Sequence, residues 1–441
     1  MHREANLIRG FIVALSLFIG QSAMADVQSM FGMGISSIGS SGAIRSSRSD
    51  LLSNYFTPSA LTDYEEVKVA ASFLYSVDNF KDIDSVVTDS VKYGASSTKT
   101  DNVDTDTPDL NNLLLGLIIP SSRKGKKHGL AAFTTMPFGK FLAVETQSAY
   151  YPQYMMYQSD GQRMTASFHF YDDWNESWDY SIGYHMYFAT GSTVVTRFPS
   201  SSDSQPSSSN VDLKVEVKPA FAPSFSLRKK LKEAQIDFSY IGERDAKLAF
   251  NADNSINVFV SPVPIVVDGN SSLYYDPMQI QIGYQKHFAK SSLYLGLEYE
   301  KWSDFKSSVM VMDISGANSF EQLNIDRSFK DIYVPRIAWS TGSDDSKWTV
   351  GYSYRPSPVK FGLDESNYLD SDRQILGFSY QMTGQKLFGL FDLDYRWGTA
   401  FQVHRLNNRY IQKQESDSVG YPGYEIGGEV YSLAVQIETN L

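Results

Sequence analysis

Hydrophobic and polar residues alternate along most of the chain from Glu65 to the C-terminus. The alternation is regular at 276–288, where one face carries Met278, Ile280, Ile282 and Tyr284 and the other carries Gln279, Gln281, Gly283 and Gln285. A period of two residues is typical of a β-strand with one apolar and one polar face. The pattern predicts fourteen strands, near 65–76, 109–120, 128–137, 162–171, 178–193, 211–228, 235–250, 276–288, 293–305, 330–341, 348–359, 373–383, 390–404 and 427–441.

The connections between these predicted strands alternate between short and long. Short polar segments follow the even-numbered strands, at 123–128, 172–177, 229–234, 289–292, 342–347 and 384–389. Long segments follow the odd-numbered strands, at 77–108, 140–161, 194–210, 251–275, 306–329, 360–372 and 405–426. Outer-membrane barrels separate short periplasmic turns from long extracellular loops in this way, whereas a soluble β-sandwich has no reason to do so. The fold class that we predict is therefore all-β, a transmembrane antiparallel β-barrel of about 14 strands.

The N-terminus has the pattern of a secretory signal peptide. His2, Arg3 and Arg9 form a positive region, the apolar run at 11–20 follows, and small residues at 23–25 suit cleavage. We expect residues 1–25 to be removed. Because no later stretch is long and apolar enough for a transmembrane helix, a membrane location would require a closed barrel. The acidic composition, a net charge of −11, argues against nucleic acid as a partner.

Residues 26–62 separate the signal peptide from the barrel, which we place at 63–441. The segment is rich in Gly and Ser, which allow a compact backbone with close approach between segments. It is unsuited to a regular helix or strand, and too apolar for a plain linker. We interpret it as a plug, or hatch, inside the lumen; a disordered periplasmic tail is the alternative.

The run from Ser49 to Leu61, SDLLSNYFTPSAL, resembles the hatch motif of the FadL-type outer-membrane transporters of long-chain fatty acids and other hydrophobic compounds. Two positions depart from the family motif, Thr57 and Ser59. The resemblance implies that the functional residues of the hatch are Asp50, Leu51, Tyr55, Pro58, Ala60 and Leu61.

A second resemblance to the same family lies in the third predicted strand and its exit, GLAAFTTMPFG at 129–139. In that family this strand is kinked and opens the wall sideways. The resemblance implies a lateral gate at Gly129, Pro137, Phe138 and Gly139. Proline has no backbone donor and weakens a strand ladder, so Pro137 and Gly139 fit the alternative of a simple strand end equally well.

Two long connections are unusually apolar, at 257–269 and 309–325. Apolar loop tips are costly unless they pack together or bind something. The family's outer loops capture ligand, which implies capture residues at Val258, Phe259, Val260, Ile265, Val266, Met310, Met312 and Phe320. Packing of both segments as a lid over the barrel mouth is the alternative.

Other chemistry has little support. Ser167 and His169 share one strand face and loosely resemble the His/Ser pair of an outer-membrane phospholipase, but alternation directs both into the lumen, away from lipid. We therefore expect no enzymatic activity. The chain has no Cys, and its His and carboxylate residues lack metal-ligand spacing, so we expect no metal site and no cofactor.

The sequence therefore predicts a passive channel of the bacterial outer membrane for hydrophobic compounds such as long-chain fatty acids. Loop capture, passage beside the hatch and lateral exit are what the resemblance implies. The expected partners are hydrophobic small molecules, outer-membrane lipids and lipopolysaccharide, and we expect a monomer. A structural or adhesive barrel and a polar-solute porin are the alternatives.

Overall fold

A computed structural model describes most of the chain. The described residues are 26–90, 97–105, 107, 109–123, 126–138, 152, 154, 156–157, 163–187, 190–198, 209–217, 219–258, 261–305, 313–314, 329–343, 345–360, 367–384 and 394–441. The predicted signal peptide, residues 1–25, lies outside them.

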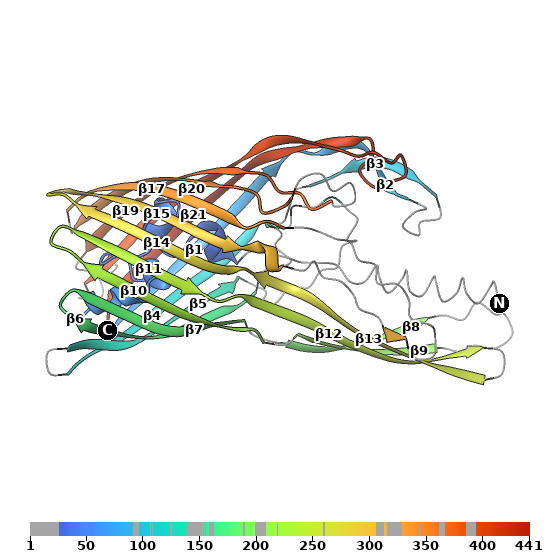
Figure 1. Cartoon of the computed structure of the whole chain (residues 1–441), viewed down its shortest axis with the longest axis horizontal. Coiled ribbons are helices and arrows are strands. Elements are labelled where there is room, and N and C mark those ends of the chain that lie inside the picture. Colours follow the sequence, from blue (N-terminus) through green and yellow to red (C-terminus); the bar gives the residue numbers. More distant parts are fainter. Residues whose placement is uncertain are drawn as a thin grey trace.

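Fourteen antiparallel strands form one closed barrel, as predicted (Figure 1). In barrel order along the chain they are β1 (Lys68–Phe80), β4 (Leu110–Arg123), β5 (Lys126–Pro137), β6 (Thr165–Asn175), β7 (Trp178–Tyr187), β10 (Phe221–Lys230), β11 (Ala234–Ile241), β14 (Met278–His287), β15 (Ser291–Lys301), β17 (Ile332–Gly342), β18 (Ser346–Arg355), β19 (Arg373–Gly384), β20 (Tyr395–Gln412) and β21 (Gly423–Asn440). The first and last strands pair from Lys68 opposite Asn440 to Phe80 opposite Gly428, which closes the barrel without a free edge.

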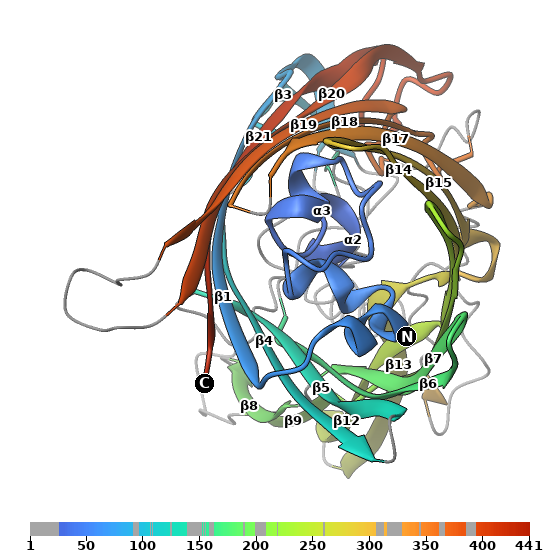
Figure 2. The same cartoon turned by 90° about the vertical axis from the view of Figure 1, so that its left-hand side faces the viewer.

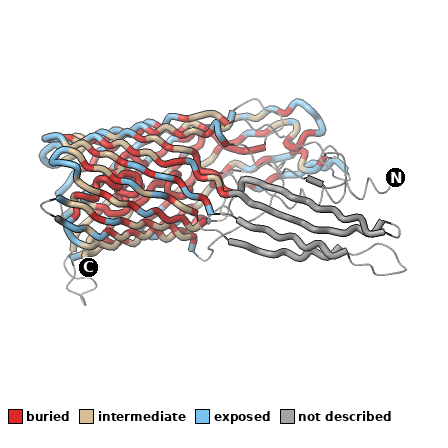
Figure 3. Tube along the Cα trace, turned by 60° about the horizontal axis from the view of Figure 1, so that its bottom comes forward, coloured by how far each residue is buried: buried red, intermediate tan, exposed pale blue. Residues whose placement is uncertain are grey.

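The sequence alternation corresponds to the two faces of the wall (Figure 3). On β17, Val334 and Ala338 are buried toward the lumen, whereas Tyr333 and Trp339 are exposed on the outer face. Large apolar side chains also cover the outside of neighbouring strands, among them Tyr284, Leu295, Trp348, Tyr352, Phe378, Trp397, Leu433 and Val435. An apolar outer face with aromatic residues is the pattern of a barrel that faces lipid.

Additional strands lie outside the barrel, largely in segments predicted as connections, although residues 211–217 and parts of 178–193 and 235–250 were predicted as barrel strands. A five-stranded sheet contains β8 (Thr190–Phe198), β9 (Ser209–Val217), β12 (Arg244–Val258), β13 (Ser261–Asp276) and β16 (Asp313–Ile314), and a hairpin contains β2 (Ile83–Asp89) and β3 (Lys99–Val103). The prediction of an apolar loop at 257–269 was therefore wrong. Its β-branched residues favour strand structure, and β13 pairs with β12 from Asp276 to Ser261.

The segment from Asp26 to Asp63 lies inside the barrel, as Figure 2 shows, and we call it the hatch. It contains the short helices α2 (Val27–Phe31) and α3 (Ile35–Gly39) and the 3-10 helices η1 (Leu52–Tyr55) and η2 (Pro58–Asp63). A further 3-10 turn, η5 (Trp302–Asp304), follows β15. Among the described residues, no helix is both long and apolar enough to cross a membrane.

Paired glycines in the wall make room for the hatch. Gly351 on β18 lies directly opposite Gly377 on β19, and both are buried. A Cβ atom on Gly351 would lie 2.2 Å from the carbonyl of Ser40, and one on Gly377 would lie 2.5 Å from the carbonyl oxygen of Ile38. The backbone from α3 to Ser40 therefore packs directly against the sheet at this glycine pair. A side chain at either glycine would prevent that contact.

Candidate functional site

The carboxylate of Asp50 organises the N-terminal half of the hatch. Its oxygens accept hydrogen bonds from the backbone N–H of Ser36 at 2.6 Å and from the hydroxyl of Ser53 at 2.5 Å. Gln436 on β21 donates to the same carboxylate at 2.8 Å. A Cβ on Gly34, whose φ is +85°, would lie 2.6 Å from Asp50 Oδ1. Asp50 therefore ties α3 to η1 and connects both to the wall.

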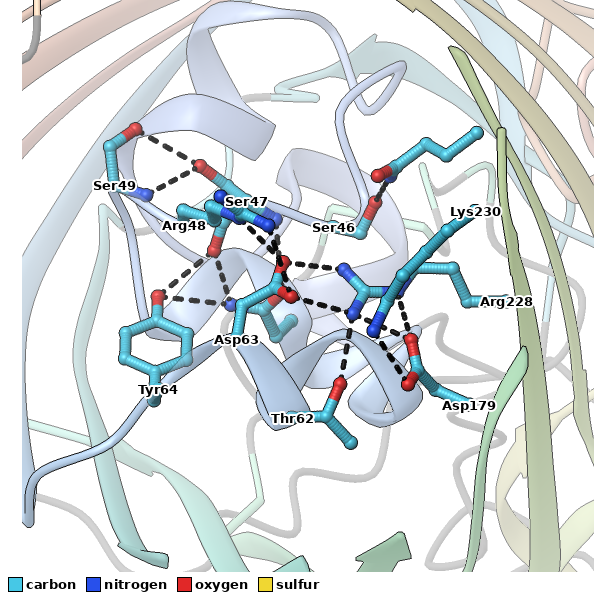
Figure 4. A network of polar contacts seen from close by, with 12 residues as sticks. Ser46, Ser47, Arg48, Ser49, Thr62, Asp63, Tyr64, Asp179, Arg228 and Lys230 are labelled. Carbon is cyan, nitrogen blue, oxygen red and sulfur yellow. Dashed lines mark hydrogen bonds and ion pairs between the residues drawn. The ribbon is translucent and has the colours of Figure 1, made fainter. Parts of the chain in front are cut away.

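A buried ion-pair cluster holds the other end of the hatch, as Figure 4 shows. Arg228 on β10 donates to Asp63 at 2.6 and 2.9 Å and to Thr62 Oγ1 at 2.9 Å. Its Nε donates to Asp179 on β7 at 2.7 Å, and Lys230 donates to the other Asp179 oxygen at 2.8 Å. The Arg228 and Asp179 side chains are almost fully buried, so the cluster is shielded from solvent and depends on its own pairing.

The charge of Asp63 is stabilised within this cluster. Burial alone would raise the pKa of its carboxyl group, but hydrogen bonds and charge from Arg228, with a smaller effect from Arg48, outweigh burial. The pKa of Asp63 is therefore well below its ordinary value. The hatch consequently ends in a carboxylate that stays ionised throughout the physiological pH range.

The aromatic side chain of Tyr55, in the hatch, contacts the third and fifth strands of the barrel. The Tyr55 ring lies edge-on to Phe133 of β5 at 5.9 Å and to His185 of β7 at 4.9 Å, and its hydroxyl is 2.9 Å from His185 Nδ1. His169 of β6 lies 5.3 Å from the His185 ring. Ser167 and His169 are both buried on the lumen side, as alternation predicted, away from the lipid face.

The lumen face of β15 carries a line of charged groups beside the hatch. Glu298 pairs with Arg45 of the hatch and, at 2.7 Å, with Arg336 of β17. Two residues further along, Glu300 accepts hydrogen bonds from Arg355 of β18 and, at 2.7 Å, from the indole Nε1–H of Trp302. Alternation of the strand thus places acidic residues at successive lumen positions. Glu298 is paired with an arginine of the adjacent strand β17, and Glu300 with one of β18, two strands away.

An apolar pocket lies just beyond Trp302, at the barrel end where the long connections emerge. It encloses about 280 Å³ of empty space, part of it open to solvent, and is lined by Met156, Trp302, Phe329, Pro358, Val359, Tyr368, Leu369 and Asp370. Phe305 packs beside it, with its ring 4.8 Å from that of Phe329. The residues come from three different connections, so the barrel must close before the pocket exists.

The structure places the predicted hatch residues Asp50, Leu51, Tyr55, Pro58, Ala60 and Leu61 inside the lumen, and all are buried. At the motif departure Ser59, the backbone N–H donates to Ser226 Oγ of β10 at 2.9 Å, a contact that any residue other than proline could make, and the Ser59 hydroxyl is buried without a hydrogen-bond partner among the described residues. Alternation could have identified Arg228, Glu298 and Arg336 as lumen-facing charges. Sequence reasoning missed their pairing with the hatch, since no local pattern specifies a partner on a distant strand.

The predicted gate strand, β5, is paired on both sides through most of its length. It pairs with β4 up to Pro137 opposite Asn112, and with β6 from His128 opposite Asp172 to Thr135 opposite Thr165, without a register shift. Gly129 and Pro137 therefore lie within the wall, and the exposed Phe138 lies just beyond the strand. Gly139 lies outside the described residues.

The predicted capture residues are not brought together in the part of the chain that the structure describes. Val258 ends β12, and Ile265 and Val266 belong to β13, so these three positions are strand residues. Phe259, Val260, Met310, Met312 and Phe320 lie outside the described residues. The apolar pocket at Trp302 is instead formed by residues that no capture prediction included.

No protein-family model and no curated relative matches the sequence. Solved structures do match the fold over nearly the whole chain. A Pseudomonas aeruginosa FadL homologue is 11% identical with a TM-score of 0.59, and the match covers 92% of this chain and 97% of that one. The P. putida toluene transporter TodX is 12% identical with a TM-score of 0.52, covering 93% and 99%. The monoaromatic hydrocarbon channel CymD is 10% identical with a TM-score of 0.54, covering 95% and 99%.

These likenesses agree with the sequence resemblance at 49–61 and 129–139, which was recognised on separate grounds. Identities of 10–12% are too low to carry a substrate from those proteins to this one, but the shared architecture extends over almost every strand. The chain has the FadL-type barrel fold.

Proposed function

We propose that the protein is an outer-membrane channel through which hydrophobic compounds diffuse without an energy source. The observation that carries this proposal is the apolar pocket around Trp302 and Phe329, at the end of a lipid-facing barrel whose lumen contains the hatch. A hatch in the lumen narrows any aqueous pore, whereas an apolar pocket at the barrel mouth attracts compounds that water excludes. The similar structures include a toluene transporter and a monoaromatic hydrocarbon channel.

The pocket favours a small, uncharged, ring-containing compound over a long-chain fatty acid. Its aromatic residues Trp302, Phe329 and Tyr368 offer ring faces and edges. Its one acidic lining residue, Asp370, is paired with Arg373 at 3.0 Å, and the described lining contains no Lys or Arg that would pair with a fatty-acid carboxylate. We expect long-chain fatty acids to compete poorly at this pocket, although they remain candidates for the channel as a whole.

The route from the pocket must pass the hatch. We propose that the hatch shifts locally to admit the compound and that the compound leaves sideways at the upper end of β5. Among the described residues, the pairing of β5 with β6 ends at Thr135, whereas Met136 and Pro137 still pair with β4. We therefore place the lateral exit at Met136 and Pro137, where the fewest strand pairings have to break.

A reversible lock on the hatch tests this function. Ser59 N and Ser226 Oγ are 2.9 Å apart, and the chain has no Cys, so the double variant Ser59→Cys/Ser226→Cys contains one possible disulfide. We expect the oxidised variant to lose uptake of radiolabelled toluene into proteoliposomes and the reduced form of the same preparation to regain it. Each single-cysteine variant controls for the substitutions themselves.

Equal uptake by the oxidised and reduced forms would contradict hatch-dependent passage. If neither toluene uptake nor palmitate uptake exceeds that of protein-free liposomes, the result contradicts transport altogether and favours an adhesive barrel. In a parallel measurement, Phe329→Ser should lower toluene uptake severalfold, while Tyr333→Ser, on the exposed outer face nearby, should leave it unchanged.

A further inference from the structure

The wall contains a second pair of directly opposed glycines, Gly283 on β14 and Gly296 on β15. Both face the lumen by alternation, as do Gly351 and Gly377, but the hatch does not cover them. A Cβ on Gly296 would meet only the side chain of Arg336, at 3.5 Å, and one on Gly283 only that of Asp237, at 3.6 Å. One glycine pair therefore seats the hatch, whereas the other leaves space beside it.

That space is a chamber between the hatch and strands β11, β14, β15 and β17. It contains about 430 Å³ of empty space, part of it open to solvent. Its hatch side is formed by Gly42, Ala43, Arg45 and Ser46, and its wall side includes Asp237 and Gln281. This chamber is separate from the pocket at Trp302, with which it shares no lining residue.

The chamber is chemically unlike the apolar pocket. Five of its lining residues carry a buried polar atom with no hydrogen-bond partner among the described residues: Arg45 Nη1, Asp237 Oδ1, Gln281 Nε2, Glu298 Oε1 and Arg336 Nε. Buried polar atoms are costly unless water or another polar group reaches them. The lining also balances Arg45 and Arg336 against Glu298 and Asp237, so the chamber has no excess charge to attract ions of one sign.

Polar groups continue from the chamber to the barrel end with the short turns. Tyr294 accepts hydrogen bonds from Gln285 at 3.2 Å and from Ser340 at 3.3 Å. Gln285 lies 3.4 Å from His287, which is exposed at the end of β14. Arg45 and Arg336, which both line the chamber, bind Glu298.

We propose that this chamber is a side path for water, separate from the route of hydrophobic compounds. The glycine pair provides its width, the balanced lining provides hydrogen bonds without net charge, and removal of the Arg45 side chain would widen it. The path concerns a different solute class and different residues from the proposed function, and does not rest on it.

Osmotic shrinkage of proteoliposomes in hyperosmotic sucrose, followed by stopped-flow light scattering, tests the path. Wild-type protein should pass water faster than protein-free liposomes. Gly296→Leu should reduce the rate severalfold by filling the chamber, and Gly296→Ala should reduce it less. Arg45→Ala should raise the rate severalfold, since Glu298 keeps its pair with Arg336. Leu295→Met, on the outer face of the same strand, serves as the matched control.

A larger side chain at position 296 can also strain the strand, so the series is interpreted together with Arg45→Ala, which should change the rate in the opposite direction. Heat-modifiable migration on a gel verifies that each barrel is folded, and Arg45→Ala keeps the test informative should Gly296→Leu not insert. Water permeability equal to that of protein-free liposomes, or rates unchanged by both Gly296→Leu and Arg45→Ala, would overturn the proposal. Toluene uptake measured in the same vesicles reports on the proposed function independently.

Discussion

Arg228 and Asp63 join the wall to the hatch through two hydrogen bonds, 2.6 and 2.9 Å long, between residues 165 positions apart in the sequence. Arg228→Ala would leave Asp63 and Asp179 as neighbouring buried carboxylates. Removing one partner of a buried ion pair costs roughly 3–5 kcal/mol. We expect the hatch to loosen while the barrel persists, and limited trypsin digestion in detergent should then cut at Arg45 and Arg48.

Lys230→Ala provides the control for this prediction. Lys230 contacts the same Asp179, but its side chain is 33% exposed, so its loss should cost under about 1 kcal/mol. Equal trypsin resistance in Arg228→Ala and the wild type would contradict an anchoring role for the pair.

The hatch should withstand mild acid. Because the pKa of Asp63 is lowered in the folded protein, its contribution to hatch docking is present above the ordinary aspartate pKa and is lost only as pH falls through the lowered value. A fluorophore on Ser47→Cys, in the hatch, should give a constant signal from pH 8 to about pH 5 and change only in stronger acid. Asp63→Asn should show a loosened hatch already at pH 7. A transition between pH 5 and 7 in the wild type would point to a different titrating group.

The two glycine pairs predict opposite outcomes for the same substitution. Gly351→Val places a Cβ where the carbonyl of Ser40 lies, so α3 must move away from the wall. Overpacking of this kind typically costs about 1–3 kcal/mol. Gly296→Val faces open space and should leave the hatch docked. Hydrogen–deuterium exchange of peptides from 26–63 should be faster in Gly351→Val only; equal exchange in both variants would contradict the seating of α3.

Asp50 should stabilise the hatch more than its neighbours do. Asp50→Ala leaves the N–H of Ser36 and the amide of Gln436 without their acceptor, and unmet buried hydrogen bonds cost about 1–3 kcal/mol each. Ser49→Ala, which loses only a half-buried contact with Ser47, is the control. The protease resistance of the hatch is measured for both variants at increasing urea concentration. Equal urea midpoints for the loss of resistance in the two variants would be evidence against the organising role of Asp50.

The sequence by itself determined the strands of the barrel and the two faces of each strand. Successive side chains of a strand point to opposite faces. The local order of residues is therefore enough to place Phe378 on the outer face and Ser379 on the lumen face. The short and long connections determined that the sheet is an antiparallel barrel. The motif at 49–61 located a segment that the structure places in the lumen, because a compact Gly- and Ser-rich run carries its own local signal.

Only the tertiary structure decided which residues contact one another inside the barrel. Barrel closure and strand register bring Gly283 opposite Gly296 and Gly351 opposite Gly377, yet in the sequence these are four ordinary strand glycines. Register likewise pairs Arg228 with Asp179, and the path of the hatch adds Asp63. The tertiary structure also decided the conformation of β12 and β13. These segments pair as strands where local composition had predicted a loop. Such contacts depend on the relative shift of every strand around the closed sheet, which no short stretch of sequence encodes.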